Sequence, residues 1–131
     1  MSFDSSIKIL YVDDSLVIRD MVASSLMQIG YMQIESAEDG VEALALCNEE
    51  EYDFIITDIN MPNMDGIELI RNLRDKLNYI STPIMVLTTE WSQEMKKKGK
   101  EAGATSWIVK PFNTELLERA IEDTLNKVNN S

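Results

Sequence analysis

The eight residues from Phe54 to Met61, FIITDINM, constrain the fold and the function of this chain more than any other stretch. A short apolar run bounded by turn-forming residues predicts a buried strand, here at residues 52–57. Asp58 stands at the carboxyl end of that strand, which is the end where open parallel sheets bind ligands. Because burial of an unpaired carboxylate is costly, Asp58 is either a strand terminator that faces solvent or the centre of a site. We interpret it as the centre of a site.

The other apolar runs indicate a chain that alternates strands and helices. Runs rich in β-branched and apolar residues predict further strands at residues 7–12, 33–36, 83–88 and 105–109. Helices are expected to follow these strands, starting near Asp14 or Ser15, Asp39, Asp65, Ser92, and Asn113 or Thr114. Such alternation predicts an α/β fold in which a doubly wound, five-stranded parallel sheet carries five helices. The weak run 33–36 suits a sheet edge and the four stronger runs suit the interior, which favours the flavodoxin-like strand order 2-1-3-4-5.

The expected helices place apolar residues at a helical period. In the first helix these positions are Leu16, Met21, Val22, Leu26 and Ile29. The third helix is expected to reach Leu77. Gly99, inside the fourth helix, is unfavourable by roughly 1 kcal/mol relative to Ala, and the sequence offers no reason for it. We expect one domain over residues 1–131, with frayed ends at residues 1–5 and 128–131.

The composition excludes several classes of function. The formal net charge of −11 argues against non-specific binding to nucleic acid or to an anionic membrane. The chain contains no His, which removes His-based catalysis. Its single Cys, Cys47, fits a reducing compartment, and neither a signal peptide nor an apolar run long enough to span a bilayer is evident. These features predict a cytoplasmic protein.

The residues that end the expected strands form a chemically coherent set. They are Asp13 and Asp14 after the first strand, Asp58 after the third, Thr88 at the end of the fourth and Lys110 after the fifth. In a parallel sheet these ends lie on one rim, so the fold would gather the side chains in one pocket. Three neighbouring carboxylates favour a hard cation such as Mg²⁺, and a Lys ammonium suits phosphoryl oxygens. With a carboxylate nucleophile, this set predicts a phosphoryl-transfer site.

Each of these residues also has an ordinary structural explanation when taken alone. An Asp-Asp-Ser sequence after a strand is often only a helix cap. A Lys-Pro pair is usually part of a loop, and Thr is common in strands. It is the occurrence of all of them at the ends of the right strands that favours a site.

The motifs resemble those of a known family. The matching segments are Tyr11-Val12-Asp13-Asp14-Ser15, Asp58-Ile59-Asn60-Met61-Pro62 with Asp65-Gly66, Thr88, and Lys110-Pro111-Phe112. With them, essentially the whole chain resembles the receiver domains of bacterial response regulators, most closely the CheY group of single-domain chemotaxis regulators. The resemblance implies that a histidine kinase phosphorylates Asp58. It also implies a switch that turns over no separate substrate and is therefore not an enzyme in the usual sense.

The resemblance also implies roles for the neighbouring residues. Asp14, Asp58 and the main-chain carbonyl of Asn60 would bind Mg²⁺, and Asp13 would act directly or through water. Lys110 would pair with the phosphoryl group and Thr88 would move towards it, coupled to a rotamer change at Trp107. Asn60 and Glu90 occupy positions that tune self-dephosphorylation in the family. The Lys110-Pro111 peptide bond is typically cis.

The implied output surface is the face formed by the fourth helix, the fifth strand and the fifth helix. In this chain it would carry Trp91, Lys96, Lys97, Lys100, Trp107 and Glu90. The lysines are either a solvated helix face or a docking site for an acidic amphipathic segment, such as that of the flagellar motor switch protein. Trp107 is either part of the switch or plain core.

Three alternatives remain open at this point. A phosphorelay intermediate or phosphate sink would pass its phosphate to another histidine protein instead of binding the motor. A phosphohydrolase with an Asp nucleophile usually carries a second Asp two residues on, where this chain has Asn60. A flavodoxin-like cofactor carrier would need a phosphate-binding loop after the first strand, where two Asp would repel a phosphate. We expect a monomer, and a phosphatase is a possible further partner.

Overall fold

The computed structural model of the chain describes residues 4–129 as alternating strands and helices around one sheet. In chain order the elements are β1 Lys8–Val12, α1 Leu16–Ile29, β2 Gln33–Ala37, α2 Gly40–Glu49, β3 Phe54–Thr57, α3 Gly66–Arg74, the 3₁₀ helix η1 Leu77–Tyr79, β4 Ile84–Thr88, α4 Gln93–Ala102, β5 Ser106–Val109 and α5 Thr114–Asn129. Every paired strand runs parallel to its neighbour, in the order β2-β1-β3-β4-β5. The predicted fold class and strand order are confirmed.

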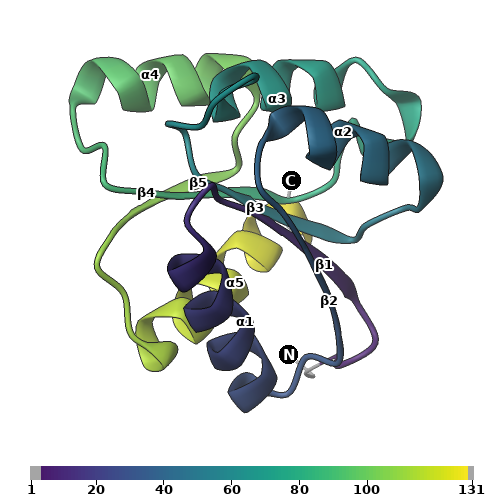
Figure 1. The fold of residues 1–131 in the computed structure, drawn as a ribbon, viewed down its shortest axis with the longest axis vertical. Coiled ribbons are helices and arrows are strands. Elements are labelled where there is room, and N and C mark those ends of the chain that lie inside the picture. The colour runs from purple at the N-terminus through teal and green to yellow at the C-terminus, as the bar shows by residue number, and fades with distance from the viewer. Residues whose placement is uncertain (1–3, 130–131) are drawn as a thin grey trace.

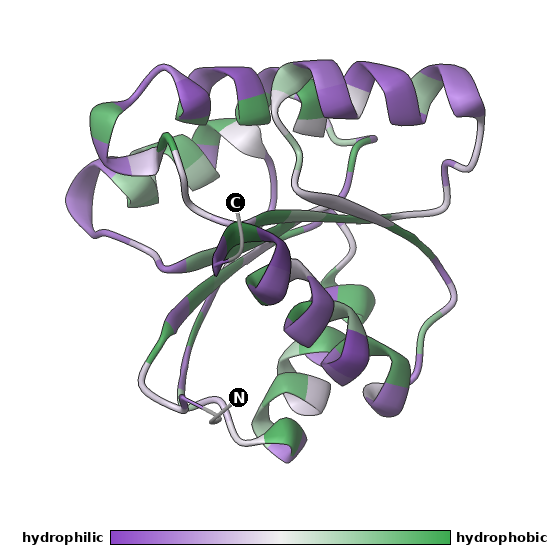
Figure 2. Cartoon of the chain, turned by 180° about the vertical axis from the view of Figure 1, so that it is seen from behind, coloured by the Kyte–Doolittle hydropathy of each residue, from purple (hydrophilic) through white to green (hydrophobic). Residues whose placement is uncertain are grey.

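The sheet is the middle of three layers. Helices α2, α3 and α4 cover one face, and α1 and α5 cover the other (Figure 1). Each face buries its own apolar core, with Ile55 and Ile70 in the first and Ile56 and Ile121 in the second. Figure 2 shows mostly hydrophobic central strands between the two helical layers, with hydrophilic residues prominent along α4 and α5. All four residues of β3 are buried, which confirms that the strand leading to Asp58 is central.

The expectation that the fifth strand lies inside the sheet was wrong. Strand β5 is an edge strand that pairs only with β4 among the described strands, and all of its residues are half-buried. Its apolar side chains are nevertheless covered on the sheet faces, since Trp107 packs against the first core and Ile108 against the second. Apolar character therefore reports burial of the two sheet faces and not the presence of a neighbouring strand.

Capping residues fix where the helices begin. The side chains of Ser15, Asp39, Asp65 and Ser92 each accept a hydrogen bond from a backbone N–H in the first turn of the helix that follows. Asn113 does the same for α5, its Oδ1 lying 2.7 Å from the Leu116 N. These interactions satisfy N–H groups that have no partner within the helix. They aim the amino ends of α1 and α3 at the rim where β1 and β3 end.

The third helix is shorter than expected. It ends at Arg74, and Leu77, which was expected on its buried side, is 89% exposed. Tyr79 of η1 is fully buried in the core instead of Leu77. Its burial is possible because its hydroxyl donates to the Glu50 carbonyl at 2.9 Å. The Arg74 guanidinium stabilises this arrangement by donating to the carbonyls of Tyr79, Thr82 and Gly103 at 2.7 to 3.0 Å.

Two further expectations also need correction. In α1, Leu16 and Met21 are 63% and 49% exposed, and Ser25 is buried beside Val22 and Leu26. At the carboxyl end, α5 continues through Asn129 instead of fraying from residue 128. Ser5 and Ser6 form a turn in which Ser6 donates to the Asp4 carboxylate, and the expected fraying of 1–3 and 130–131 lies outside the described residues. Within the described part of the chain, no helix is both long enough and apolar enough to cross a bilayer.

Candidate functional site

The carboxyl ends of β1, β3, β4 and β5 meet at one rim of the sheet, as the sequence predicts. One oxygen each from Asp13, Asp14 and Asp58 lies within 4.8 Å of the other two. Backbone hydrogen bonds across the sheet bring these residues together. The Asp58 N–H donates to the Val12 carbonyl at 2.9 Å, and the Lys110 N–H donates to the Thr88 carbonyl at 2.7 Å.

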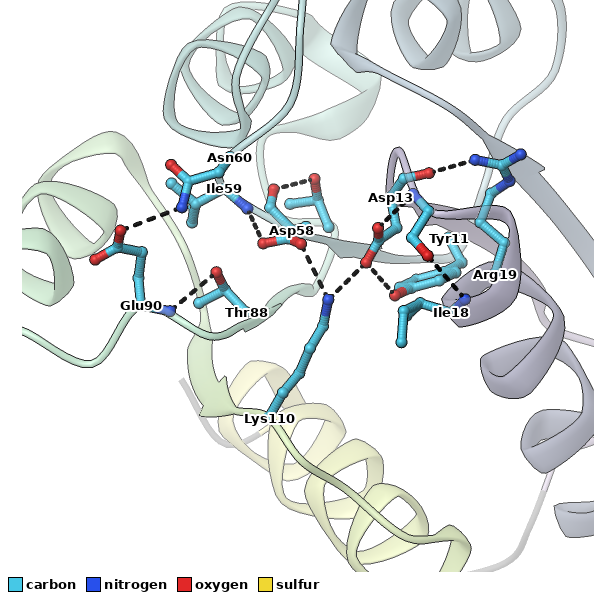
Figure 3. Close-up of polar contacts among 12 residues, drawn as sticks. Tyr11, Asp13, Ile18, Arg19, Asp58, Ile59, Asn60, Thr88, Glu90 and Lys110 are labelled. Carbon is cyan, nitrogen blue, oxygen red and sulfur yellow. Dashed lines mark hydrogen bonds and ion pairs between the residues drawn. The ribbon is translucent and has the colours of Figure 1, made fainter.

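Lys110 bridges two of the three carboxylates. Its Nζ lies 2.7 Å from Asp13 Oδ2 and 3.0 Å from Asp58 Oδ2, and Figure 3 shows it reaching up between them. The Lys110 side chain is only 12% exposed. Burial by itself would lower the pKa of Lys110, but the hydrogen bonds with Asp13 and Asp58 outweigh it and raise the pKa. The ammonium therefore remains charged and partly offsets the repulsion among the carboxylates.

Asp13 is the most constrained residue of the site. Its Oδ2 accepts from Lys110 and, at 2.8 Å, from the Tyr11 hydroxyl, while its Oδ1 accepts from the Ser15 N–H at 2.9 Å. Burial by itself would raise the pKa of the Asp13 carboxyl, but these hydrogen bonds outweigh it and hold the pKa below its usual range. Asp13 is thus a fixed anion with three of about four acceptor positions occupied.

Asp58 is held in place but remains reachable. Its Oδ1 accepts from the Ile59 N–H at 2.6 Å and its Oδ2 accepts from Lys110, yet the side chain is 12% exposed. The chain after Asp58 turns back closely on itself, because a Cβ at Gly66 would lie 2.1 Å from the Asp58 carbonyl oxygen. Gly66 is therefore required for the turn that presents Asp58 at the rim.

Thr88, Glu90 and Trp107 form a connected group beside these charges. Thr88 is fully buried, and its Oγ1 accepts from the Glu90 N–H at 3.3 Å. The Glu90 carboxylate accepts from the Asn60 amide at 3.2 Å (Figure 3), and the Glu90 carbonyl accepts from Trp107 Nε1 at 2.9 Å. Trp107 therefore does more than fill the core, because its indole also forms a hydrogen bond with the segment between β4 and α4.

The site has the ligands that a hard divalent cation requires. Carboxylate oxygens from Asp13, Asp14 and Asp58 converge, and Asp14 is exposed at the mouth of the pocket. Asn60 lies in the loop after β3, two residues beyond Asp58, and its side chain is engaged by Glu90. Oxygen ligands of this kind suit Mg²⁺, whose charge would relieve the remaining repulsion.

The sequence-based prediction missed two residues that organise the site. Tyr11 stands two residues before Asp13, so the two side chains share one side of the strand and the phenol reaches the carboxylate. Arg19 of α1 donates from Nη1 to the Asp13 carbonyl at 2.7 Å. The strand period could have revealed Tyr11. Nothing in the sequence pattern indicates the Arg19 contact.

The expected output residues lie on and beside α4. Trp91 is 72% exposed, Lys97 and Lys100 are exposed, and Lys96 is half-buried. Trp107 and other residues of β5 and α5, Asp123 and Lys127 among them, line a groove of about 560 Å³. The structure therefore exposes an aromatic ring and two lysines on and just before α4, and a separate open groove between β5 and α5.

Comparison with known proteins decides the family. The family model described as the response regulator receiver domain matches residues 9–122. The chain belongs to this family. Its relatives include the chemotaxis protein CheY-3 of Vibrio cholerae, with 32% identity over 95% of this chain and 96% of the relative. The CheY homolog of Campylobacter jejuni is 38% identical over 90% of this chain and 92% of the relative. Among solved structures, CheY4 of Vibrio cholerae has a TM-score of 0.85 and 47% identity, over 90% of this chain and 98% of that one.

The protein is thus a receiver domain of the CheY type, consistent with chemotaxis signalling. Receiver domains of this type are signalling proteins and not classical enzymes, and they generally bind Mg²⁺ at an acidic pocket of the kind formed here by Asp13, Asp14 and Asp58. The Lys110-Pro111 peptide bond is cis, as the resemblance implied.

Proposed function

We propose that this protein is a phosphorylation switch in which Asp58 accepts a phosphoryl group from a phosphohistidine of a histidine kinase. The observation that carries the proposal is the position of Lys110 Nζ between Asp13 and Asp58, beside a nucleophile that solvent can still reach. An Asp58 carboxylate oxygen would attack the phosphorus as the P–N bond breaks, and the imidazole nitrogen would take up a proton as it leaves.

Each side chain of the site has a distinct part in this step. Asp13, Asp14, Asp58 and the Asn60 carbonyl would hold Mg²⁺, which would neutralise charge on the phosphoryl oxygens when bound. The Lys110 ammonium is already aligned with Asp58 and would bind a phosphoryl oxygen. Thr88 supplies a buried hydroxyl near the same rim.

We propose that the output surface formed by α4, β5 and α5 binds an acidic, amphipathic partner segment, most simply that of a flagellar motor switch protein. Lys96, Lys97 and Lys100 form no ion pair among the described residues, and they stand out on a chain of net charge −11. Unpaired cations on α4, together with the exposed Trp91 ring just before that helix, suit such a segment. The relatives named for chemotaxis support this target over a phosphate sink, and the cytoplasm is the compartment that contains such kinases and switches.

The first test is tryptophan fluorescence during addition of Mg²⁺ and then acetyl phosphate. We expect one change with the metal and a second with the phosphodonor, and the second should be lost in Asp58→Asn. Asp75→Asn is the matched control, because Asp75 is exposed just after the far end of α3. It should behave as wild type. A wild-type protein that ignores Mg²⁺ would contradict the proposed mechanism.

The second test separates motor output from phosphate relay. Phosphorylated and unmodified protein are compared for binding to a flagellar switch protein, and phosphorylated protein is also mixed with a histidine phosphotransfer domain. A gain in switch-protein affinity that Lys96→Glu and Lys100→Glu reduce supports motor output. Rapid transfer of the phosphate to the phosphotransfer domain, without switch-protein binding, would favour the relay.

A further inference from the structure

Gly99 of α4, for which the sequence offered no reason, packs against the Trp107 ring. Gly99 lies inside the helix, buried and outside the positive-φ region, so its backbone conformation does not require glycine. A Cβ at this position would lie 2.5 Å from Trp107 Cζ3 and 2.8 Å from Cε3. A Cβ essentially never comes this close to a carbon atom of another side chain, so any side chain at position 99 would displace the Trp107 ring or the helix. The missing side chain makes room for the indole.

The opposite edge of the same ring is also fixed. Trp107 Nε1 donates to the Glu90 carbonyl at 2.9 Å, while Cζ3 and Cε3 of the six-membered ring face Gly99. Because an indole is rigid, it cannot retreat from α4 and keep this hydrogen bond unless the backbone also moves. Gly99 therefore controls whether the indole reaches the segment between β4 and α4.

That segment is part of the site described above. The Glu90 N–H donates to Thr88 Oγ1 and the Glu90 carboxylate accepts from Asn60 (Figure 3). Glu90 therefore makes three hydrogen bonds here: its N–H with Thr88, its carboxylate with Asn60 and its carbonyl with Trp107.

We propose that Gly99 is a positioning residue: it forms a notch in α4 that seats the Trp107 indole, and the seated indole holds Glu90 beside Thr88. The consequence for signalling rests on the proposed function, whereas the pairing of Gly99 with Trp107 does not. In this arrangement the Trp107 ring couples α4 to the phosphorylation pocket. The size of the side chain at position 99 determines how strongly the two are coupled.

The direct test follows the indole N–H groups by ¹⁵N nuclear magnetic resonance in protein without metal or phosphodonor. The chain has two Trp, so Trp91, which is 72% exposed, is an internal reference. In Gly99→Ala the Trp107 indole signal should shift and its hydrogen exchange should quicken by about tenfold, the loss of one hydrogen bond. The Trp91 signal should not move. Glu101→Ala, at an exposed position of the same helix, should leave both signals unchanged.

A double-mutant cycle makes the inference independent of whether Gly99→Ala folds well. With Trp107 present, Gly99→Ala should lower the urea midpoint of unfolding. In a Trp107→Val background it should raise the midpoint, because Ala favours a helix more than Gly does once the ring is gone. The same sign in both backgrounds, or an unchanged Trp107 signal, would overturn the pairing.

The signalling consequence is measured separately. Phosphorylation of Gly99→Ala by acetyl phosphate should slow by about threefold or more, as expected for a change along a coupled contact, while Glu101→Ala, at an exposed position of the same helix, keeps the wild-type rate. An unchanged rate in Gly99→Ala would remove the link to the pocket. A wild-type protein that accepts no phosphate would instead contradict the proposed function and leave the indole results standing.

Discussion

The hydrogen bond from Tyr11 to Asp13 should contribute measurably to stability. Tyr11 and Asp13 are each 1% exposed, and their oxygens are 2.8 Å apart. Burial, and then the nearby Asp13 carboxylate, raise the pKa of the Tyr11 hydroxyl, so the phenol stays protonated and donates. Tyr11→Phe removes one donor from a buried anion and changes little else, which should cost about 2 kcal/mol of unfolding free energy.

The chain provides a matched control for this substitution. Tyr52 is also buried, at 2% exposed, but its hydroxyl has no hydrogen-bond partner within residues 4–129. Tyr52→Phe removes the same atom without breaking a bond, so stability should stay level or rise slightly.

Urea denaturation followed by circular dichroism measures both variants. With an ordinary slope for a domain of this size, the Tyr11→Phe midpoint should fall by roughly 1 M relative to wild type. The measurements are made in EDTA, so that metal binding does not add to stability. Equal midpoints for Tyr11→Phe and Tyr52→Phe would show that the hydroxyl adds nothing to Asp13, and the reasoning would be refuted.

Three further substitutions test the charges and the fold. Lys110→Met leaves Asp13 and Asp58 without their cation, so it should lower the unfolding free energy in EDTA by about 3 kcal/mol, and added Mg²⁺ should restore part of the loss. Arg74→Met keeps the aliphatic stem but leaves several carbonyls without a donor, and should cost about 3 kcal/mol in the same urea assay. The hydrogen bond from the Glu42 N–H, and then that from the Asn63 amide, lower the pKa of Asp39 in the folded protein. The ionised Asp39 carboxylate therefore stabilises the fold above about pH 4, and this stabilisation is lost as the pH falls through the pKa of the folded state. Asp39→Asn should therefore flatten the acid side of the stability profile, and an unchanged acid slope would contradict this assignment.

The sequence was sufficient for the order of the sheet and for most of the charged pocket. Strand patterns and caps are local signals, and right-handed parallel crossovers leave few ways to connect the strands. Lys110 and Asp13 are 97 positions apart, yet each ends a strand on the same rim, so topology alone predicted that they meet. The exposed sides of Leu16 and Leu77 were not predictable in this way, since apolar periodicity does not show which neighbour covers a helix.

Only the tertiary structure decided the contacts that depend on how closely two elements approach each other. Gly99 appeared as an unfavourable residue in a helix, because the ring that needs its space comes from β5. Nothing in the sequence pattern singled out Arg74, although its guanidinium donates to the carbonyls of Tyr79, Thr82 and Gly103. Propensity and periodicity describe a residue relative to its own element, whereas these roles arise where two elements approach closely. The sequence therefore determined which residues surround the pocket, and the packing of α4 on β5 determined how one of them, Trp107, is connected to it.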